Sequence, residues 1–572
     1  MEKKKTFVFF CISFICVGIL FIVLYKTFGF YYETNDDTSM KGIVSGYFNG
    51  EPDAHMIYIR YVIGVLLASL YKIISGIDWY GVFMIGVLAL SIASIVYKYY
   101  ISLHKVRRYG VYIALLLILV TLMLSEIVFF QWTTVAAFPA MAVIVMLLLK
   151  ENKYCFDWET WMIVALAILS FSIRKNVFYM ALPMIAIIIV SQYLYPLFDK
   201  DRKQVDKKSL VRVLVPCVMI IVSIFAIELI DKWAYSDDRW SEYRRFNSAR
   251  SDIMDYGGFP SYEGNEEFYA ALGLSRAEAV CLEQFGVMKE VDSELFSRIA
   301  EYNERKSGDL PLKQSVVSAV ELMKGILKSE AYRWWHFYMF VSVVILLLQT
   351  LKYKKNVWMK VATAAVQGII LVYLVCKGRF PARIVYVYDM YIIMYCLSML
   401  ILEIGDKSKE IVKKALRFAG IVICGILTLV QINTVLERRQ TYENGVVEYD
   451  FVQSYVESQE GQIVTIATGT FVGTKQKFRL HSDIAISDQL GTGGWSLHSP
   501  YMEDKKKQLG IEKDELYLLK ENSQLVTASL EEAQMICDYY SLFTSGEVVY
   551  EVVNNFVSPR GTEAYVCVLK EK

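Results

Sequence analysis

The feature that most constrains this chain is a series of eleven long apolar segments. Each has close to the twenty or so residues that cross a bilayer as a helix. They cover residues 7–25, 80–97, 110–128, 133–149, 159–173, 177–196, 211–231, 335–351, 358–376, 384–402 and 418–436. The mean hydropathy of +0.36 is well above that of soluble proteins. We therefore expect an all-α polytopic membrane protein with about eleven transmembrane helices.

The basic residues orient these helices. Lys3, Lys4 and Lys5 precede the first apolar segment, which has no small-residue cleavage site, so we interpret it as a retained signal anchor with a cytoplasmic N-terminus. Each loop then assigned to the cytoplasm is basic, as the positive-inside rule requires. This alternation holds only if the apolar segment 57–76 lies along the outer surface. The alternative, that 57–76 crosses, inverts the orientation of everything that follows.

The chain divides into a membrane domain and a tail. Residues 1–436 form the membrane domain, with outward loops at 26–79 and 232–334, and residues 437–572 form an extracytoplasmic domain. The tail alternates strand-like runs with a helix that begins at Ser529-x-x-Glu532, which predicts a small α/β domain. The strand-like runs are 463–467, 515–519, 547–553 and 564–569. A second helix start, Ser275-x-x-Glu278, lies in the large outer loop.

Charge and cysteine content exclude several classes of protein. The net charge of +1 provides no basic field, so we expect no nucleic-acid partner. The ten cysteines form no Cys-x-x-Cys pair and lie mostly in apolar segments, which argues against a zinc site or a dense disulfide framework. Cys537 and Cys567 in the tail could pair or remain free.

Ionisable residues gather at the outer ends of the apolar segments. A transporter is expected to have its polar site near the middle of the membrane. Two basic patches lie on the outside, Arg174-Lys175 and Lys377-Gly-Arg379-Phe-Pro-Ala-Arg383. One interpretation is that they bind lipid headgroups or pair with acids such as Glu126 and Glu228. The other is a phosphate site for a lipid-linked substrate, because arginine binds phosphate oxygens in a bidentate fashion. We expect the phosphate-binding residues to be Arg174, Lys175, Arg379 and Arg383.

The acidic pair Asp36-Asp37 follows the first apolar segment directly, and we expect both side chains to be exposed. Neighbouring residues on a helix point about 100° apart, so the two carboxylates should have different tasks. One is a candidate general base for a hydroxyl, and the other is a candidate to orient it or to hold Mg²⁺ or Mn²⁺, although no complete ligand set is visible. The alternative is an ordinary helix start, since Asn35 and Asp36 are good N-cap residues.

The segment after the acidic pair contains Asn49-Gly50-Glu51-Pro52, and a late outer loop contains Arg379-Phe-Pro-Ala-Arg383-Ile-Val-Tyr. Together with the topology, these motifs resemble the GT-C superfamily of membrane glycosyltransferases, in its bacterial protein mannosyltransferase-like and aminoarabinose transferase-like branches. Asp36 or Asp37 takes the place of the family's acid after the first span. The usual double proline is absent, because Pro52-Asp53-Ala54-His55 follows instead.

The resemblance implies a hexosyltransferase that takes a sugar from a polyprenyl-phosphate donor at the outer face. The acceptor would be an envelope glycan, lipid or protein, and direct displacement would invert the anomeric centre. We expect Asp53, His55 and Trp495 to contact substrate, the last from a Gly-rich loop of the tail. Two other classes stay open. One is a glycan or lipid transporter, and the other is a non-catalytic envelope or sensor protein.

Overall fold

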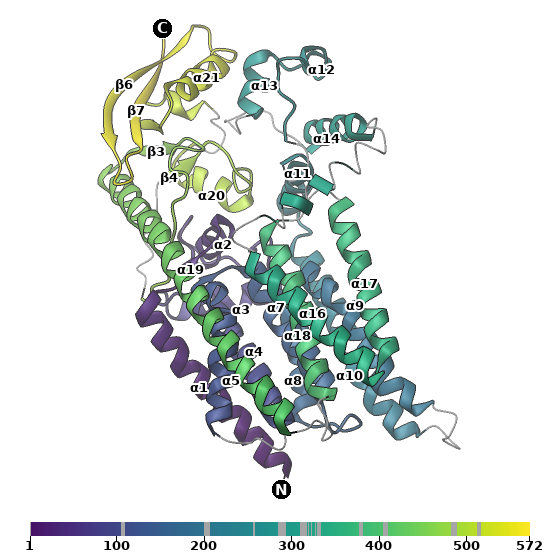
Figure 1. Cartoon of the computed structure of the whole chain (residues 1–572). Helices are drawn as coiled ribbons and strands as arrows, with labels where there is room; N and C mark the ends of the chain where they lie inside the picture. Colours follow the sequence, from purple (N-terminus) through teal and green to yellow (C-terminus); the bar gives the residue numbers. More distant parts are fainter. Residues whose placement is uncertain are drawn as a thin grey trace.

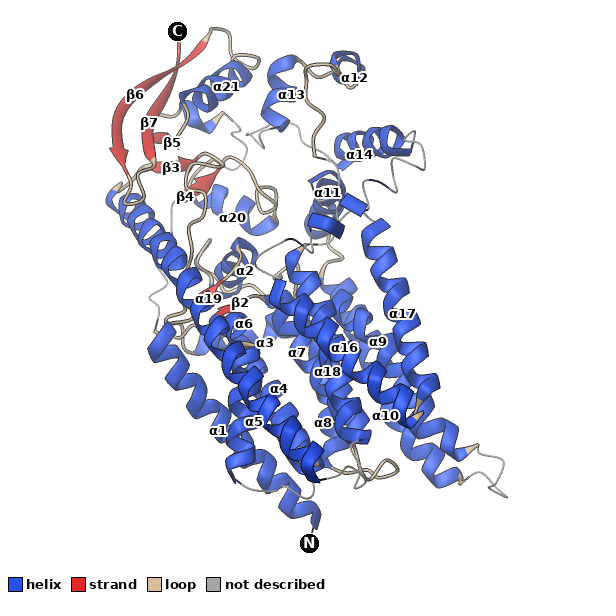
Figure 2. Cartoon of the chain, in the orientation of Figure 1, coloured by secondary structure: helices blue, strands red, loops and turns tan. Residues whose placement is uncertain are grey.

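The computed structural model describes residues 2–103, 109–198, 206–254, 258–283, 293–308, 333–376, 381–403, 410–481, 489–511 and 516–572, with a few positions between 309 and 332. A helical bundle forms one end of the molecule, and a mixed sheet with covering helices forms the other (Figures 1 and 2). The predicted class, a polytopic α-helical membrane protein with a small α/β domain after it, is confirmed.

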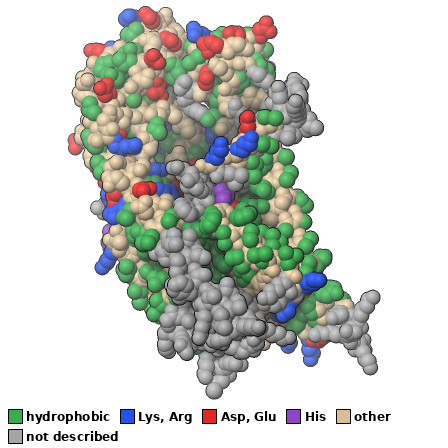
Figure 3. All heavy atoms as spheres, in the orientation of Figure 1, with side chains coloured by type: hydrophobic (Ala, Val, Ile, Leu, Met, Phe, Trp, Pro, Cys, Tyr) green, Lys and Arg blue, Asp and Glu red, His purple; other side chains and the backbone are tan. Residues whose placement is uncertain are grey.

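Seven helices in the described part of the chain are long and apolar enough to cross a membrane. They are α1 (Glu2–Phe28), α4 (Trp79–Ser102), α7 (Trp132–Leu149), α9 (Lys175–Ile189, extended by η1, Val190–Leu194, and η2, Tyr195–Leu197), α10 (Lys207–Ala234), α17 (Val357–Cys376) and α18 (Ala382–Glu403). Shorter or partly described apolar helices complete the bundle, namely α5 (Tyr109–Leu122), α8 (Trp158–Ile173) and α16 (Arg333–Tyr353). On the face shown in Figure 3, an apolar belt separates charged side chains at the two ends.

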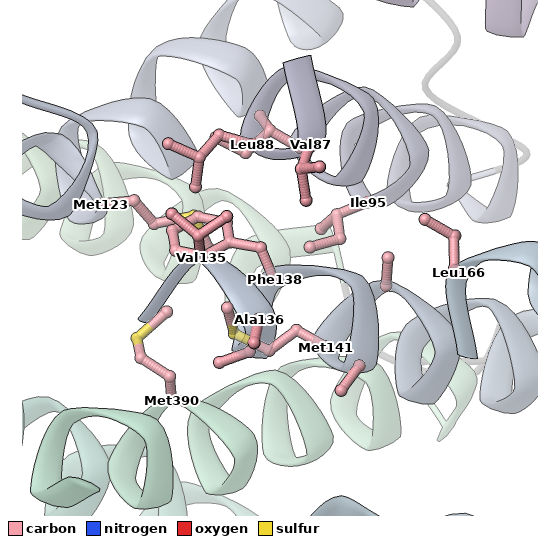
Figure 4. Packing of buried hydrophobic residues seen from close by; sticks show 14 of the residues in the cluster. Val87, Leu88, Ile95, Met123, Val135, Ala136, Phe138, Met141, Leu166 and Met390 are labelled. Carbon is pink, nitrogen blue, oxygen red and sulfur yellow. The ribbon is translucent and has the colours of Figure 1, made fainter. Parts of the chain in front are cut away.

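Helix α7 is the centre of the bundle. Every one of its residues is buried, which explains why its sequence is apolar on all sides instead of on one face. Val135, Phe138 and Met141 point outward from α7 into a shell formed by α4, α8 and α18 (Figure 4). A helix enclosed on every side is held at a fixed position, so residues at its N-terminal end are precisely located.

Helix α3 (Tyr61–Ile73) covers the apolar segment whose course decides the topology. It has 13 residues, or about 20 Å of helix, which is shorter than the roughly 30 Å hydrocarbon core. It packs against α2 (Asn35–Ser45), α4, α8 and α10 instead of forming a separate column of the bundle. This length agrees with a surface helix and not with a crossing.

Helix α19 (Glu410–Ser458) joins the bundle to the tail without a break. The predicted domain boundary after residue 436 therefore falls inside a continuous helix of 49 residues. The sheet behind it has the order β4-β3-β5-β7-β6, with β4 and β5 parallel to β3 and with β7 antiparallel to both β5 and β6. Its strands are β3 (Ile463–Ile466), β4 (Gln489–Gly491), β5 (Ser523–Thr527), β6 (Val548–Val557) and β7 (Glu563–Glu571).

The tail confirms three of the four predicted strands and corrects the fourth. Residues 517–519 form a 3₁₀ turn, η3 (Tyr517–Leu519), and the strand lies just beyond it at β5. Helix α21 (Leu530–Tyr540) begins where predicted, with the Ser529 hydroxyl accepting from the Glu532 amide. Helix α20 (Pro500–Gln508) completes this domain. Cys537 and Cys567 are buried and both free, so they form no disulfide.

The described part of the large outer loop up to residue 308 contains α11 (Asp238–Met254), α12 (Glu266–Ala271), α13 (Arg276–Glu283) and α14 (Ser293–Gly308). Ser275 and Glu278 form the predicted capping box at the start of α13. The Ser275 hydroxyl accepts from the Glu278 amide at 3.3 Å, and the Glu278 carboxylate accepts from the Ser275 amide at 2.8 Å. These helices lie over the same end of the bundle as the tail (Figure 1).

A short sheet connects the tail to the membrane domain. Strand β1 (Tyr31–Tyr32) pairs in parallel with β2 (Phe129–Phe130), next to α6 (Leu124–Val128). Residues 475–481 of the tail, here called the strap, lie along the other side of β1. The strap's Phe478 amide donates to the Phe30 carbonyl at 2.8 Å, and the Tyr32 amide donates to the Gln476 carbonyl at 3.0 Å. The strap therefore fixes the start of the first outer loop.

Candidate active site

Helix α2 carries the acidic pair in its first turn. Thr34 is the N-cap residue, and the helix ends at Gly46, whose positive φ of 82° allows its amide to bond back to the last turn. A Cβ at Gly46 would lie 2.9 Å from the backbone of Glu51, so the turn into Asn49-Gly50-Glu51-Pro52 needs glycine there. Carboxylates in a first turn are favoured by the helix dipole. A helix does start here, but its N-cap is Thr34, so the prediction that Asn35 or Asp36 is the N-cap is wrong.

Asp37 is fully buried, which corrects the expectation that both carboxylates are exposed. Oδ1 accepts from the Tyr80 hydroxyl at 2.8 Å and from the Trp132 amide at 3.0 Å, and Oδ2 accepts from the Thr34 hydroxyl at 2.7 Å. Burial raises the pKa of Asp37 to about 7, against the opposing effect of these three hydrogen bonds. Asp37 therefore fastens α2 to the first turns of α4 and α7.

Asp36 is partly exposed, and within the described residues its side chain has no hydrogen bond or ion pair. It is held beside Asp37 on a helix that cannot shift without breaking those bonds. A two-carboxylate metal site does not fit this arrangement, because the Asp37 oxygens are enclosed by protein donors. Among the described residues no three His, Cys, Asp or Glu side chains are grouped to hold a metal.

Trp132 joins the acidic pair to the first basic patch. Its amide donates to Asp37, and the guanidinium of Arg174 lies 3.8 Å from the centre of its indole ring. Arg174 stands between α8 and α9, where its Nη1 donates to the Thr133 hydroxyl at 2.9 Å. Asp37 and Arg174 thus contact the same residue, although they are 137 positions apart in the sequence.

Trp495 reaches the same place from the tail. Its ring packs edge-on against Tyr58, with ring centres 5.1 Å apart, and Tyr58 stacks on Trp132 at 5.5 Å. Trp495 itself is buried, and its carbonyl accepts from the Tyr243 hydroxyl at 2.9 Å. Trp495 is therefore part of the wall that closes the junction, and Tyr58 separates it from Trp132 and Arg174.

The remaining predicted phosphate ligands do not all come together with Arg174. Lys175 is exposed, and its ammonium lies 3.7 Å from the Glu228 carboxylate. Arg379 lies outside the described residues. Arg383 stands in the first turn of α18, and its buried Nε has no hydrogen-bond partner in the part of the chain that the structure describes. Arg174 and Arg383 remain as candidates for an anion.

Asp53 and His55 bind each other. His55 Nδ1 lies 2.6 Å from Asp53 Oδ1, and Nε2 lies 3.1 Å from the Ala234 carbonyl. The imidazole also stacks on Trp240 with ring centres 4.5 Å apart. Burial raises the pKa of Asp53, but the hydrogen bond from His55 and its charge outweigh this and lower it. Both ring nitrogens are therefore occupied in holding the first outer loop against α10 and α11.

Sequence reasoning missed several residues that shape this site. Tyr80 and Trp132 lie in the first turns of α4 and α7, and no local pattern marks them as partners of Asp37. Glu126 was noted only as an acid at an outer end. Its side chain is buried, and its Oε2 has no hydrogen-bond partner among the described residues. Arg438 of α19 also binds Glu33 at 3.1 Å.

Comparisons with known proteins are sparse. No family model matches the chain, and no curated protein matches it. Among solved structures, the chain is similar to the crystal structure of ArnT from Cupriavidus metallidurans bound to undecaprenyl phosphate. The two share 13% identity over 97% of each chain, with a TM-score of 0.32. Likeness at this level assigns neither a family nor an activity to this chain.

Proposed function

We propose that the protein is a membrane glycosyltransferase that takes a sugar from a polyprenyl-phosphate donor. The reaction would occur on the side of the membrane that carries the tail. The observation that supports this most strongly is Trp132, whose amide donates to Asp37, the neighbour of Asp36, and whose ring contacts the Arg174 guanidinium. A base and an anion-binding group at one membrane boundary are the parts that transfer from a lipid phosphate requires.

In the proposed reaction Asp36 is the general base. It accepts the proton of an acceptor hydroxyl as the oxygen attacks the anomeric carbon. The bond between that carbon and the donor phosphate oxygen breaks, and the phosphate leaves as an anion. Arg174, with Arg383 as a second candidate, would stabilise the charge on the phosphate. Attack opposite to the leaving group inverts the anomeric centre. Asp37 acts as a positioning residue, because all of its contacts are to protein donors.

The acceptor is expected to be an envelope glycan, lipid or protein hydroxyl. The helices of the large outer loop and the tail both lie over the end of the bundle that carries Asp36 (Figure 1). Support for an acceptor at this end comes from Trp495 and Tyr243, since the tail and the outer loop meet there through a hydrogen bond. A divalent cation has no role in this proposal.

The test is sugar transfer in membranes supplied with polyprenyl-phosphate hexoses, one hexose at a time. Asp36→Asn should lower the rate by roughly 10²–10⁴-fold, the usual contribution of a general base. Asp238→Asn is the matched control, because Asp238 is also an aspartate in the first turn of a helix and is exposed. Equal rates for Asp36→Asn and wild type would reject the proposal.

The same experiment separates the two rival classes. A transporter should move lipid-linked glycan without forming a new glycosidic bond, so product analysis by mass spectrometry distinguishes transport from transfer. A non-catalytic envelope or sensor protein should bind its partner equally well with Asp36→Asn. Neither rival is favoured by a specific contact at the junction of α2, α4 and α7.

A further inference from the structure

A second feature runs along much of the length of α9, and its polar end lies opposite the acidic pair. An open cavity of about 160 Å³ runs between α7, α8, α9 and α10, and we call it the lateral groove. Its wall follows α9 from Phe178 to Tyr193, which is about 22 Å at 1.5 Å per residue. Almost all of the wall is apolar. The groove thus has the length and the chemistry of a hydrocarbon chain.

The sequence explains why helices leave a groove here. Ala167 and Ala186 line it, and their small side chains leave space that larger residues would fill. Pro216 interrupts the hydrogen bonding of α10 and also lines the groove. At the end of α9 the backbone widens into the π-turn η1. These features keep α10 from closing fully onto α9.

The polar end of the groove is basic. Lys150, Lys153 and Arg212 line it. Lys150 is neutralised, because its ammonium lies 2.5 Å from Asp157 and 3.7 Å from Glu159. In contrast, no described carboxylate lies within ion-pair distance of Lys153. Arg212 forms no ion pair with a described carboxylate, although the exposed Asp206 interacts with it electrostatically. The Lys153 ammonium stands 5.6 Å from the ring of Tyr193, and Arg212 donates to the Tyr154 carbonyl at 3.2 Å.

We propose that the lateral groove is a binding site for an anionic phospholipid of the leaflet opposite the tail. One acyl chain would lie along α9 and α10, and the phosphate would lie between Lys153 and Arg212. Charge complementarity selects this occupant, because a neutral lipid leaves the Lys153 ammonium without an anionic partner among the described residues. Only the polar end of the groove, at Lys153 and Arg212, lies at the other end of α8 and α9 from Arg174. The apolar wall extends to Phe178, whose amide donates to the Arg174 carbonyl at 3.3 Å.

Native mass spectrometry of the purified full-length protein tests this. The protein would be exchanged into detergent containing either phosphatidylglycerol or phosphatidylcholine, and the bound lipid would be counted. We expect phosphatidylglycerol to be retained more strongly. Lys153→Ala with Arg212→Ala should weaken its retention by about 30-fold, since each surface cation contributes roughly fivefold to binding an anionic lipid.

A matched control is Lys207→Ala with Lys208→Ala. These two lysines are exposed at the start of α10, on the same end of the bundle, and do not line the groove. The control should retain phosphatidylglycerol as wild type does. Ala186→Phe gives an independent test, because it fills the groove without a change in charge and should also reduce retention. Equal retention by the double-alanine groove variant and wild type, or equal retention of the two lipids by wild type, would overturn the proposal.

Discussion

At the scale of single residues, the two adjacent aspartates have opposite surroundings. Asp37 accepts three hydrogen bonds in a fully buried position, whereas Asp36, one residue away, is partly exposed. The angle of about 100° between neighbouring helix positions produces this difference. Removal of the Asp37 carboxylate should therefore change the stability of the protein differently from removal of the Asp36 carboxylate. Unfolding experiments can measure this difference without an activity assay.

Asp37→Asn should change the pH dependence of stability. The pKa of Asp37 is about 7 in the fold and 3.8 in its ordinary state, so the folded chain binds this proton more tightly. By linkage, the stability of the wild type falls as pH rises from about 4 to about 7 and then levels off. Asn cannot ionise, so the free energy of unfolding of the variant, relative to that of wild type, should rise by on the order of 2 kcal/mol between pH 5 and pH 8.

Thermal unfolding in detergent at both pH values measures this difference. Asp36→Asn serves as the comparison, because it removes a carboxylate of the same helix turn that is not buried. If the difference in unfolding temperature between Asp37→Asn and wild type is the same at pH 5 and pH 8, then Asp37 does not titrate in this range.

Arg174 should be sensitive to the shape of its side chain as well as to its charge. If the proposed donor site is correct, Arg174→Ala is expected to weaken binding of a polyprenyl phosphate by about 10- to 100-fold, the effect of a lost charged hydrogen bond. Arg174→Lys should recover only part of this, because lysine lacks the planar fork that stacks on Trp132. Arg276→Ala is the control, since that side chain is 71% exposed on α13. Binding unchanged in Arg174→Ala would remove Arg174 from the phosphate site.

At the scale of elements, the strap is what holds the first outer loop in place. Lys475 donates to the Glu33 carbonyl at 2.7 Å, and the Asp78 amide donates to the Leu480 carbonyl at 3.0 Å. The strap thus binds on both sides of α2, once before it and once at the start of α4. Lys475 and Leu480 of the tail therefore help to hold α2, and with it Asp36, the proposed general base, in position.

Gly81→Ala should loosen the strap. A Cβ at Gly81 would lie 2.3 Å from the ring of Phe478 and 2.5 Å from the Tyr32 hydroxyl. Overpacking of this kind costs about 1–3 kcal/mol. Hydrogen exchange of residues 475–481 should become faster in this variant. Gly86→Ala is the control in the same helix, because nothing lies within 4 Å of a Cβ there. Equal exchange in both variants would show that the strap does not depend on this contact.

The elements themselves were largely predictable, because they depend on local signals. Apolar length predicted the bundle helices, and Ser-x-x-Glu patterns located the starts of α13 and α21 to the residue. Strand β5 was missed because the predicted run 515–519 covers the apolar turn at Tyr517, whereas the strand begins at Ser523. The continuous course of α19 was also missed, because its second half is polar and was assigned to the tail.

The site was only half predictable, for a different reason. Asp36, Asp37 and Arg174 could be named from their positions at outer ends of spans. Their link through Trp132 depends on two contacts between residues far apart in the chain, and no local pattern reports such contacts. Lys175 shares a patch with Arg174, yet the turn between α8 and α9 directs it to the surface and to Glu228. Adjacent residues of one charge can thus belong to different environments.

At the scale of the whole molecule, we expect the tail and the acidic pair to be extracytoplasmic. A cysteine introduced at Val472, which is 75% exposed in the tail, should react with an impermeant maleimide in intact cells. A cysteine introduced at Lys207, at the other end of the bundle, should react only after permeabilisation. The parent protein without an added cysteine gives the background. Labelling in the reverse order would invert the topology and place the proposed reaction in the cytoplasm.

The unbroken course of α19 has a mechanical consequence. A helix of 49 residues is a rod of about 74 Å, with one end in the bilayer and the other beneath the sheet. The length of this helix therefore determines the distance between the tail and the membrane. Its twist also counts, since one inserted residue would rotate the tail by about 100° around the rod and pull the strap out of register with β1. Length and phase of this helix are therefore both under constraint, and a relative of this protein should differ here in whole turns.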